Sequence, residues 1–191
     1  MNESEELFRR FCEFQGWRVE RIDAHSMPHG SSVPDFRIVR RSSRGIVVEV
    51  KQFDPNEEEQ EAQRRLEAGG RGSLSGTPGK RLRGVISKAN KQLKALGASE
   101  PGMLVVHNRT RNWLHDDPDS VRTAMHGLDV IDVYVPAGHE LPPAFGPRRP
   151  GPGKKLTADM NTSVSCVAVL RESWSASSAA ARGRGYALEV Y

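Results

Sequence analysis

The sequence has little of what marks a membrane protein or a disulfide-stabilised secreted protein. No apolar run approaches the ~20 residues that a transmembrane helix needs. The two cysteines, Cys12 and Cys166, are too few and too far apart for a disulfide framework or a zinc site. The first residues, Met1 to Glu6, are acidic, which argues against a secretory or organellar signal. We therefore expect a cytoplasmic protein without a membrane partner.

Charge is present but unevenly distributed along the 191 residues, whose formal net charge is +4. Residues 69–100 contain seven Lys or Arg and one acidic residue, whereas residues 55–68 contain five Glu and two Arg. A concentrated basic segment suggests a polyanionic partner such as nucleic acid. The alternative is that this segment is only a solvated helix face.

Hydrophobic periodicity predicts an α/β domain with a central mixed β-sheet flanked by helices, in the order α-β-β-β-α-β. Helices are predicted over residues 3–15, 54–70, 81–96 and 119–127, with a strand over 17–22, a hairpin over 33–53 and further strands over 102–108, 129–135, 163–170 and 186–191. The last two strands are expected to pair with each other and to extend or cover the sheet.

Two local features refine these expectations. The first helix has an apolar stripe and an expected N-cap at Ser4. The stripe consists of Leu7, Phe8, Phe11 and Phe14. Residues 136–155 are rich in Pro, Gly and basic residues, which predicts a loop.

The predicted hairpin contains charged residues inside segments that otherwise have the pattern of buried strands. Side chains alternate between the two faces of a strand, so the register decides which of them meet. With the turn centred on Ser42, the apolar pairs are Phe36 with Val48 and Ile38 with Ile46. This register gives the hairpin one continuous apolar face.

The same register brings three charged side chains together on the other face. Asp35 lies opposite Glu49, and Lys51 projects in the same direction two residues further along. Directly opposed carboxylates repel one another, so the pair weakens the sheet unless a cation lies between them. Mg²⁺ is commonly held by one or two carboxylates together with water and phosphate oxygens. The pattern therefore indicates half of a metal site. The alternative is a salt-bridged hairpin, in which Lys51 pairs with Glu49 and Asp35 caps the turn into the strand.

Pro34-Asp35, thirteen intervening residues and Glu49-Val50-Lys51 together resemble the signature of the PD-(D/E)XK nuclease superfamily, which has the restriction-endonuclease-like fold. The preceding helix, the three strands, and the helix and strand that follow are similar to the core order of that superfamily. The resemblance covers residues 3–107. It implies a nuclease-like domain over residues 1–135 with an insertion at 54–80, and a C-terminal part, 136–191, that packs on the same domain.

The resemblance implies a Mg²⁺-dependent nuclease, with Mn²⁺ as a substitute ion. Asp35, Glu49 and the backbone carbonyl of Val50 would bind the metal, and Lys51 would position or deprotonate the attacking water. A glutamate on the first helix would complete the site, and the spacing in resolvase-like members points to Glu5. Glu6 and Glu13 remain alternatives.

The resemblance also implies a polar residue on the helix after the motif, where Lys88 and Gln92 are the candidates. His25 and His29 precede Asp35 and could approach a phosphate, although an ordinary polar loop is the alternative.

We expect a nucleic-acid partner, in particular DNA, bound by the basic helix in restriction, phage defence or repair. The residues expected to bind it are Lys80, Arg81, Arg83, Lys88, Lys91 and Lys94. A homodimer would supply the two sites that cutting both strands requires. Two other functions stay open: a nucleic-acid-binding protein of the same fold that does not cut, and an interaction module that uses the basic helix on an acidic protein.

Overall fold

The computed structural model describes residues 1–23, 33–39, 45–73, 76–96, 100–110, 112–135, 142, 144–174 and 184–191. The helices are α1 (Glu3–Phe14), α2 (Glu57–Glu67), α3 (Lys80–Ala95) and α4 (Pro118–His126), with a short 3-10 helix η2 (Trp113–His115). The strands are β1 (Arg18–Arg21), β2 (Phe36–Val39), β3 (Ile46–Phe53), β4 (Gly102–Asn108), β5 (Asp129–Tyr134), β6 (Ala144–Pro150), β7 (Cys166–Trp174) and β8 (Arg184–Val190). The predicted turn centre at Ser42 and the loop with His25 and His29 lie outside these residues.

Six strands form one mixed sheet in the order β1-β2-β3-β4-β7-β8. Strands β3, β4 and β7 are parallel, while β1, β2 and β8 join them through antiparallel pairs. The parallel strands lie in the centre, and β4 is buried along almost its whole length, as expected of strands covered on both faces. The predicted α/β fold class is confirmed, and so is the pairing of the last two strands, which extend the sheet.

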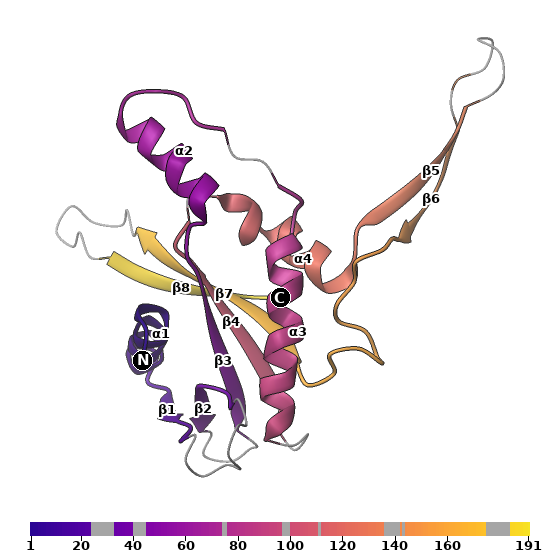
Figure 1. The fold of residues 1–191 in the computed structure, drawn as a ribbon. Helices are drawn as coiled ribbons and strands as arrows, with labels where there is room; N and C mark the ends of the chain where they lie inside the picture. Colours follow the sequence, from indigo (N-terminus) through magenta and orange to yellow (C-terminus); the bar gives the residue numbers. More distant parts are fainter. Residues whose placement is uncertain are drawn as a thin grey trace.

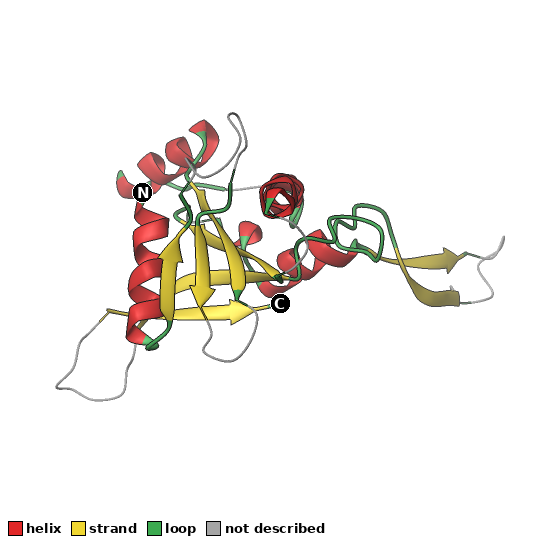
Figure 2. Ribbon diagram, turned by 90° about the horizontal axis from the view of Figure 1, so that it is seen from below, coloured by secondary structure: helices red, strands yellow, loops and turns green. Residues whose placement is uncertain are grey.

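Alternate residues of the central strands fill two separate cores, one on each face of the sheet. Val48, Val50 and Val105 pack against α1, whereas Val47 and Leu104 pack against α3 and α4. Figures 1 and 2 show α1 on one side of the sheet and α3 with α4 on the other. A residue of β3 therefore faces α1 or α3 according to whether its number is even or odd.

The start and the apolar stripe of α1 differ from the expectation. Asn2, not Ser4, is the N-cap, and its side chain accepts a hydrogen bond from the N–H of Glu5. Ser4 lies within the first turn and is fully buried. Phe14, the last residue of α1, is 86% exposed and does not belong to the buried stripe.

Strands β5 and β6 form a separate two-stranded ribbon that projects from the body of the molecule as an arm (Figures 1 and 2). The prediction of a loop over 136–155 is therefore wrong for residues 144–150, which form β6. Pro147 and Pro150 weaken the sequence signal of a strand, but a ribbon edge tolerates residues that lack an N–H.

In the part of the chain that the structure describes, no helix combines the length and apolarity that crossing a membrane requires.

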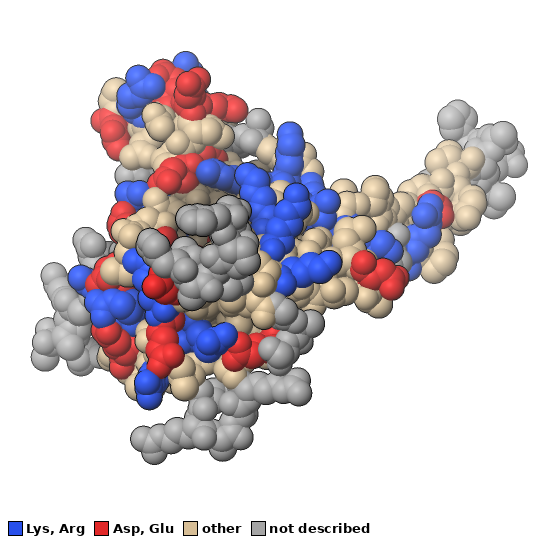
Figure 3. Space-filling view, turned by 60° about the horizontal axis from the view of Figure 1, so that its bottom comes forward, with Lys and Arg blue, Asp and Glu red and all other residues tan. Residues whose placement is uncertain are grey.

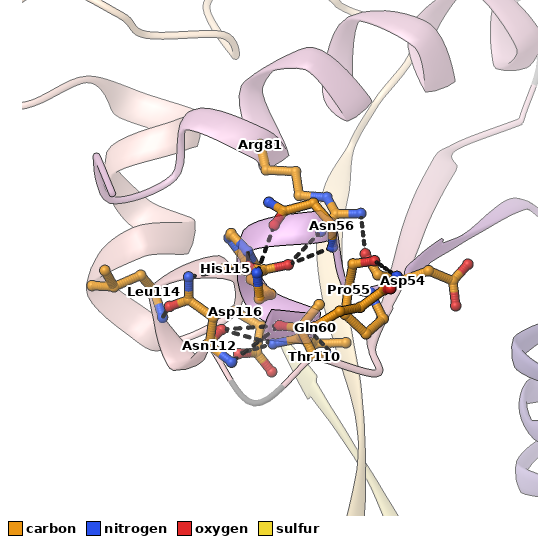
Figure 4. A network of polar contacts seen from close by, with 12 residues as sticks. Asp54, Pro55, Asn56, Gln60, Arg81, Thr110, Asn112, Leu114, His115 and Asp116 are labelled. Atoms are coloured by element: carbon orange, nitrogen blue, oxygen red, sulfur yellow. Dashed lines mark hydrogen bonds and ion pairs between the residues drawn. The ribbon is translucent and has the colours of Figure 1, made fainter. Parts of the chain in front are cut away.

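A buried polar network fastens the inserted helix α2 to the body (Figure 4). Glu59 closes a capping box with Asn56 and also accepts a hydrogen bond from the amide of Asn112, at 3.2 Å. Nε2 of His115 lies 2.5 Å from the same carboxylate, and the guanidinium of Arg81 lies 3.6 Å from it. Burial raises the pKa of Glu59, but the hydrogen bonds from Asn56, His115 and Asn112 outweigh it and hold the pKa below its ordinary value. Glu59 is thus the carboxylate that joins α2, α3 and η2.

We expect Glu59→Ala to lower the free energy of unfolding by about 2–4 kcal/mol, because it removes a helix cap and leaves buried donors without an acceptor. Urea unfolding monitored by circular dichroism measures this change. Glu58→Ala is the matched control, since Glu58 is exposed on the same helix turn and its loss should change stability by less than about 0.5 kcal/mol. Equal effects of the two substitutions would contradict the role given to Glu59.

Candidate active site

Strand β3 carries Glu49 and Lys51 on the face of the sheet that α3 covers. Both residues alternate with Val50, whose side chain belongs to the core under α1. Glu49 is completely buried, and Lys51 forms an ion pair with Oε1 of Glu49. The β2–β3 register pairs Phe36 with Val48 and Ile38 with Ile46, which confirms the register expected from the apolar residues.

The carboxyl group of Glu49 lies in an environment that disfavours its charge. Burial is the main cause and the nearby Asp35 carboxylate adds to it, while Lys51 and Gln92 act in the opposite direction; the net effect raises the pKa of Glu49 to about 7. Within the described part of the chain, neither oxygen of Glu49 has a partner with good hydrogen-bond geometry. A cation placed beside such a carboxylate would stabilise its charged form.

Asp35 lies just before β2 and is held against β3 by its side chain as well as by its backbone. Its N–H donates to the carbonyl of Val48 at 3.1 Å, and its Oδ2 accepts from the N–H of Val50 at 2.8 Å. Burial raises the pKa of Asp35, the Val50 N–H lowers it, and the charge of Glu5 raises it again, with a net upward shift. The carboxylate of Asp35 therefore lies close enough to Glu49 for its charge to raise the pKa of the Glu49 carboxyl.

Among the three glutamates that the sequence offered on α1, Glu5 is the one that lies at this site. Its side chain is almost fully buried, and its Oε2 has no hydrogen bond within the described residues; the nearest cation is Arg21, at 3.7 Å. Glu6 is instead bound by Arg9 and Arg10, and the hydrogen bond from Arg9 is the main cause that lowers the pKa of Glu6 to about 2.

Glu13 lies outside the site as well, because it pairs with Arg9 on the outer face of α1. The helix glutamate whose charge reaches Asp35 is thus Glu5.

A second set of residues, which sequence reasoning missed, holds the start of α1 against the sheet. The hydroxyl of Ser4 donates to Oε1 of Gln52 at 2.8 Å and lies 2.7 Å from Nδ1 of His107 on β4. Gln52 has an even number on β3 and so faces α1, a signal that the alternation of that strand already contained. Because Glu5 follows Ser4 directly, this contact determines where the Glu5 carboxylate lies.

The two candidates on α3 differ in position. Gln92 lies at the site: its side-chain N–H donates to the carbonyl of Val33 at 3.4 Å and it acts on the carboxylate of Glu49. Lys88, one turn earlier, is exposed and has no ion pair with a described residue.

The other basic residues of α3 divide into engaged and free side chains. Arg81 donates to the carbonyl of Asp54 at 2.7 Å and stacks over Phe53 at 4.7 Å, and Arg83 donates to the carbonyl of Pro78 at 3.2 Å. The exposed cations of this helix are Lys80, Lys88, Lys91 and Lys94. The sequence could not separate these groups, since the partners of Arg81 lie on other elements.

The donor set fits Mg²⁺ better than a transition metal. Among the described residues, no three His, Cys, Asp or Glu side chains are arranged to hold a metal ion. Mg²⁺ needs only one or two carboxylates, because water and phosphate oxygens complete its shell. Asp35 and Glu49 provide that pair, and Oε2 of Glu49 and Oε2 of Glu5 accept no hydrogen bond from the described residues. The salt-bridged hairpin accounts for the contacts of Lys51 and Asp35 but leaves these oxygens unexplained.

The raised pKa of Glu49 predicts how stability depends on pH in the presence of EDTA. Between about pH 4.5, the ordinary glutamate value, and pH 7, the folded chain binds this proton more tightly than the unfolded chain does. The free energy of unfolding should therefore fall as pH rises through this window, with a slope of at most about 1.4 kcal/mol per pH unit for one proton. Urea unfolding across this pH range should show a flatter curve for Glu49→Gln. Parallel curves for the two proteins would contradict the shift.

Comparison of the whole chain with protein-family models, with curated proteins and with solved structures found no match in any of the three. The resemblance to the PD-(D/E)XK nucleases thus rests on the motif, the order of the elements and the side chains just described.

Proposed function

We propose that this chain is a Mg²⁺-dependent nuclease that hydrolyses phosphodiester bonds, with DNA as its substrate. The observation that carries the proposal is the burial of Glu49 beside Asp35 and Lys51, with both carboxyl pKa values raised. Opposed carboxylates in the centre of a sheet are unfavourable in the free chain, and a bound divalent cation would turn the repulsion into attraction.

Each residue of the site has a chemical role in this proposal. Asp35 and Glu49 would hold Mg²⁺, and Glu5, whose charge acts on Asp35, would bind a water of its shell. When bound, the ion would neutralise charge on the phosphate and lower the pKa of a bound water. Lys51, whose ammonium forms an ion pair with Glu49, would orient the attacking water and the phosphate. Gln92 contributes an amide donor from α3 on the same side.

The nuclease proposal makes Asp35 and Lys51 essential for turnover. Asp35→Asn and Lys51→Met should each reduce the rate of Mg²⁺-dependent cleavage by at least about 100-fold, since they remove a metal ligand and the group that positions water. Gln92→Ala should reduce it less. The measurement is cleavage of single-stranded, double-stranded and branched DNA, and of RNA, with Mg²⁺ or Mn²⁺.

Asp159→Asn is the matched control, because Asp159 is exposed and has no ion pair with any described residue. It should cleave at the rate of the unaltered protein. Cleavage that persists in Asp35→Asn and Lys51→Met would place the activity elsewhere. If the unaltered protein binds these substrates but cuts none of them, the chain is a binding module and the nuclease proposal is wrong.

Metal binding can be tested without any substrate. A ligand at ten times its Kd adds about 1.4 kcal/mol to the free energy of unfolding, which corresponds to a rise in Tm of about 3–6 °C for a chain of this size. Mg²⁺ should raise the Tm of the unaltered protein and of Asp159→Asn, but not that of Asp35→Asn or Glu49→Gln. An equal rise in all four proteins would show that Mg²⁺ binds at another place.

A further inference from the structure

The outer side of α3 carries cations without counter-charges. The helix contains six Lys or Arg and no acidic residue. Lys80, Lys88, Lys91 and Lys94 are exposed and form no ion pair with any residue that the structure describes. Figure 3 shows Lys and Arg side chains gathered between the body and the start of the arm, where α3 lies. These lysines are therefore available to an anionic partner.

The distribution of these charges disfavours the helix in the free chain. The first turn contains cations and no acid, although the N-terminal end of a helix dipole favours negative charge. Lys88, Lys91 and Lys94 follow at intervals of three residues, at which like charges repel. A polyanion along the helix would relieve both effects.

Three of the free lysines lie on the two flanks of the outermost line of the helix, and Lys91 lies on that line. At 3.6 residues per turn, Gly84 and Lys91 lie opposite the centre of the buried face, which consists of Leu82, Ile86, Ala89 and Leu93. Lys88 lies on the flank of Gln92 and the active site. Lys80 and Lys94 lie on the other flank, toward residues 151–163, where the N–H of Ser163 donates to Oδ1 of Asn90.

Gly84 has no structural reason to be a glycine. It lies within α3 with no positive φ, and no atom lies within 4 Å of the position that a Cβ would occupy. Glycine within a helix is less favourable than alanine, so packing and backbone geometry both permit a better residue there. A glycine on the outer line of a helix does, however, let another molecule approach the backbone closely.

We propose that the outer face of α3 enters the major groove of duplex DNA, with Gly84 toward the base edges and the lysines on its flanks contacting phosphates of both strands. An α-helix is about 10–12 Å in diameter, and the major groove of B-DNA is about 12 Å wide. The deep, narrow major groove of duplex RNA does not admit such a helix. This inference rests on the proposed nuclease function and names its substrate class.

Binding is measured by fluorescence anisotropy in EDTA, with a DNA duplex of about 20 base pairs at several salt concentrations. Lys80→Ala, Lys88→Ala and Lys94→Ala should each weaken binding and make the slope of log Kobs against log salt less steep by about 0.9. Arg10→Ala is the matched control, since Arg10 is exposed on α1, which covers the opposite face of the sheet. It should leave the slope unchanged.

Gly84→Gln separates folding from binding. It should raise Tm by about 2–4 °C, because a good helix former replaces glycine. It should nevertheless weaken duplex binding at least about tenfold, since a long side chain would hold the helix away from the groove, while Gly84→Ala should have a smaller effect. Binding by Gly84→Gln as tight as that of the unaltered protein would overturn the proposal.

The EDTA measurement also distinguishes this inference from the nuclease proposal. Cleavage of DNA together with unchanged salt slopes in the lysine variants would overturn the groove contact and leave the nuclease intact. Salt slopes that change as expected, in a protein that cuts no substrate, would support the groove contact and overturn the nuclease. Absence of duplex binding, or tighter binding of single strands or of duplex RNA, would also overturn the groove contact.

Discussion

The buried carboxylate of Glu49, beside the ammonium of Lys51 in the middle of the sheet, is the constraint around which the site is built. A charged group removed from water is stabilised only if partners replace its hydration, and Lys51 alone does not satisfy both oxygens of Glu49. The carboxylate of Asp35 does not act as such a partner, because its negative charge further disfavours the charged form of Glu49. The surrounding elements must therefore hold these groups together against their mutual repulsion.

Three separate segments provide that restraint. The N–H of Val50 donates to the Asp35 carboxylate, so the start of β2 is held against β3 at the position of the site. Gln92 reaches the same place from α3 on one face of the sheet. Glu5 comes from α1 on the other face, where Ser4 is bound to Gln52 and His107. The site thus lies where both layers of helices approach one end of the short strand β2.

The parts of the chain outside this core have different structural roles. Strand β7 pairs with the edge of β4 that β3 leaves open, and β8 pairs in turn with β7. The parallel strand β4 therefore lies inside the sheet, where parallel strands are usually found. The buried carboxylate of Glu59 attaches the inserted α2, with partners that come from α3 and from the segment after β4. The arm formed by β5 and β6 keeps Phe145 and Tyr134 exposed.

Sequence patterns were sufficient for features that neighbouring residues encode. The alternation of apolar residues predicted the register of Phe36 with Val48. This was possible because side chains alternate between the two faces of a strand, so the sequence itself shows which side is buried. Asp35, Glu49 and Lys51 could be grouped for the same reason, since one hairpin carries all three.

Only the tertiary structure decided features that depend on partners distant in sequence. Asn2 and Ser4 are both good helix caps, and the contact of Ser4 with β3 and β4 leaves Asn2 to cap α1. Arg81 has the sequence context of a surface cation, but Asp54 and Glu59 bind it. Strand β6 contains prolines and forms because β5 pairs with it. In each case the outcome depends on contacts between segments that local periodicity cannot specify, because the free energy of those contacts exists only once the chain is folded.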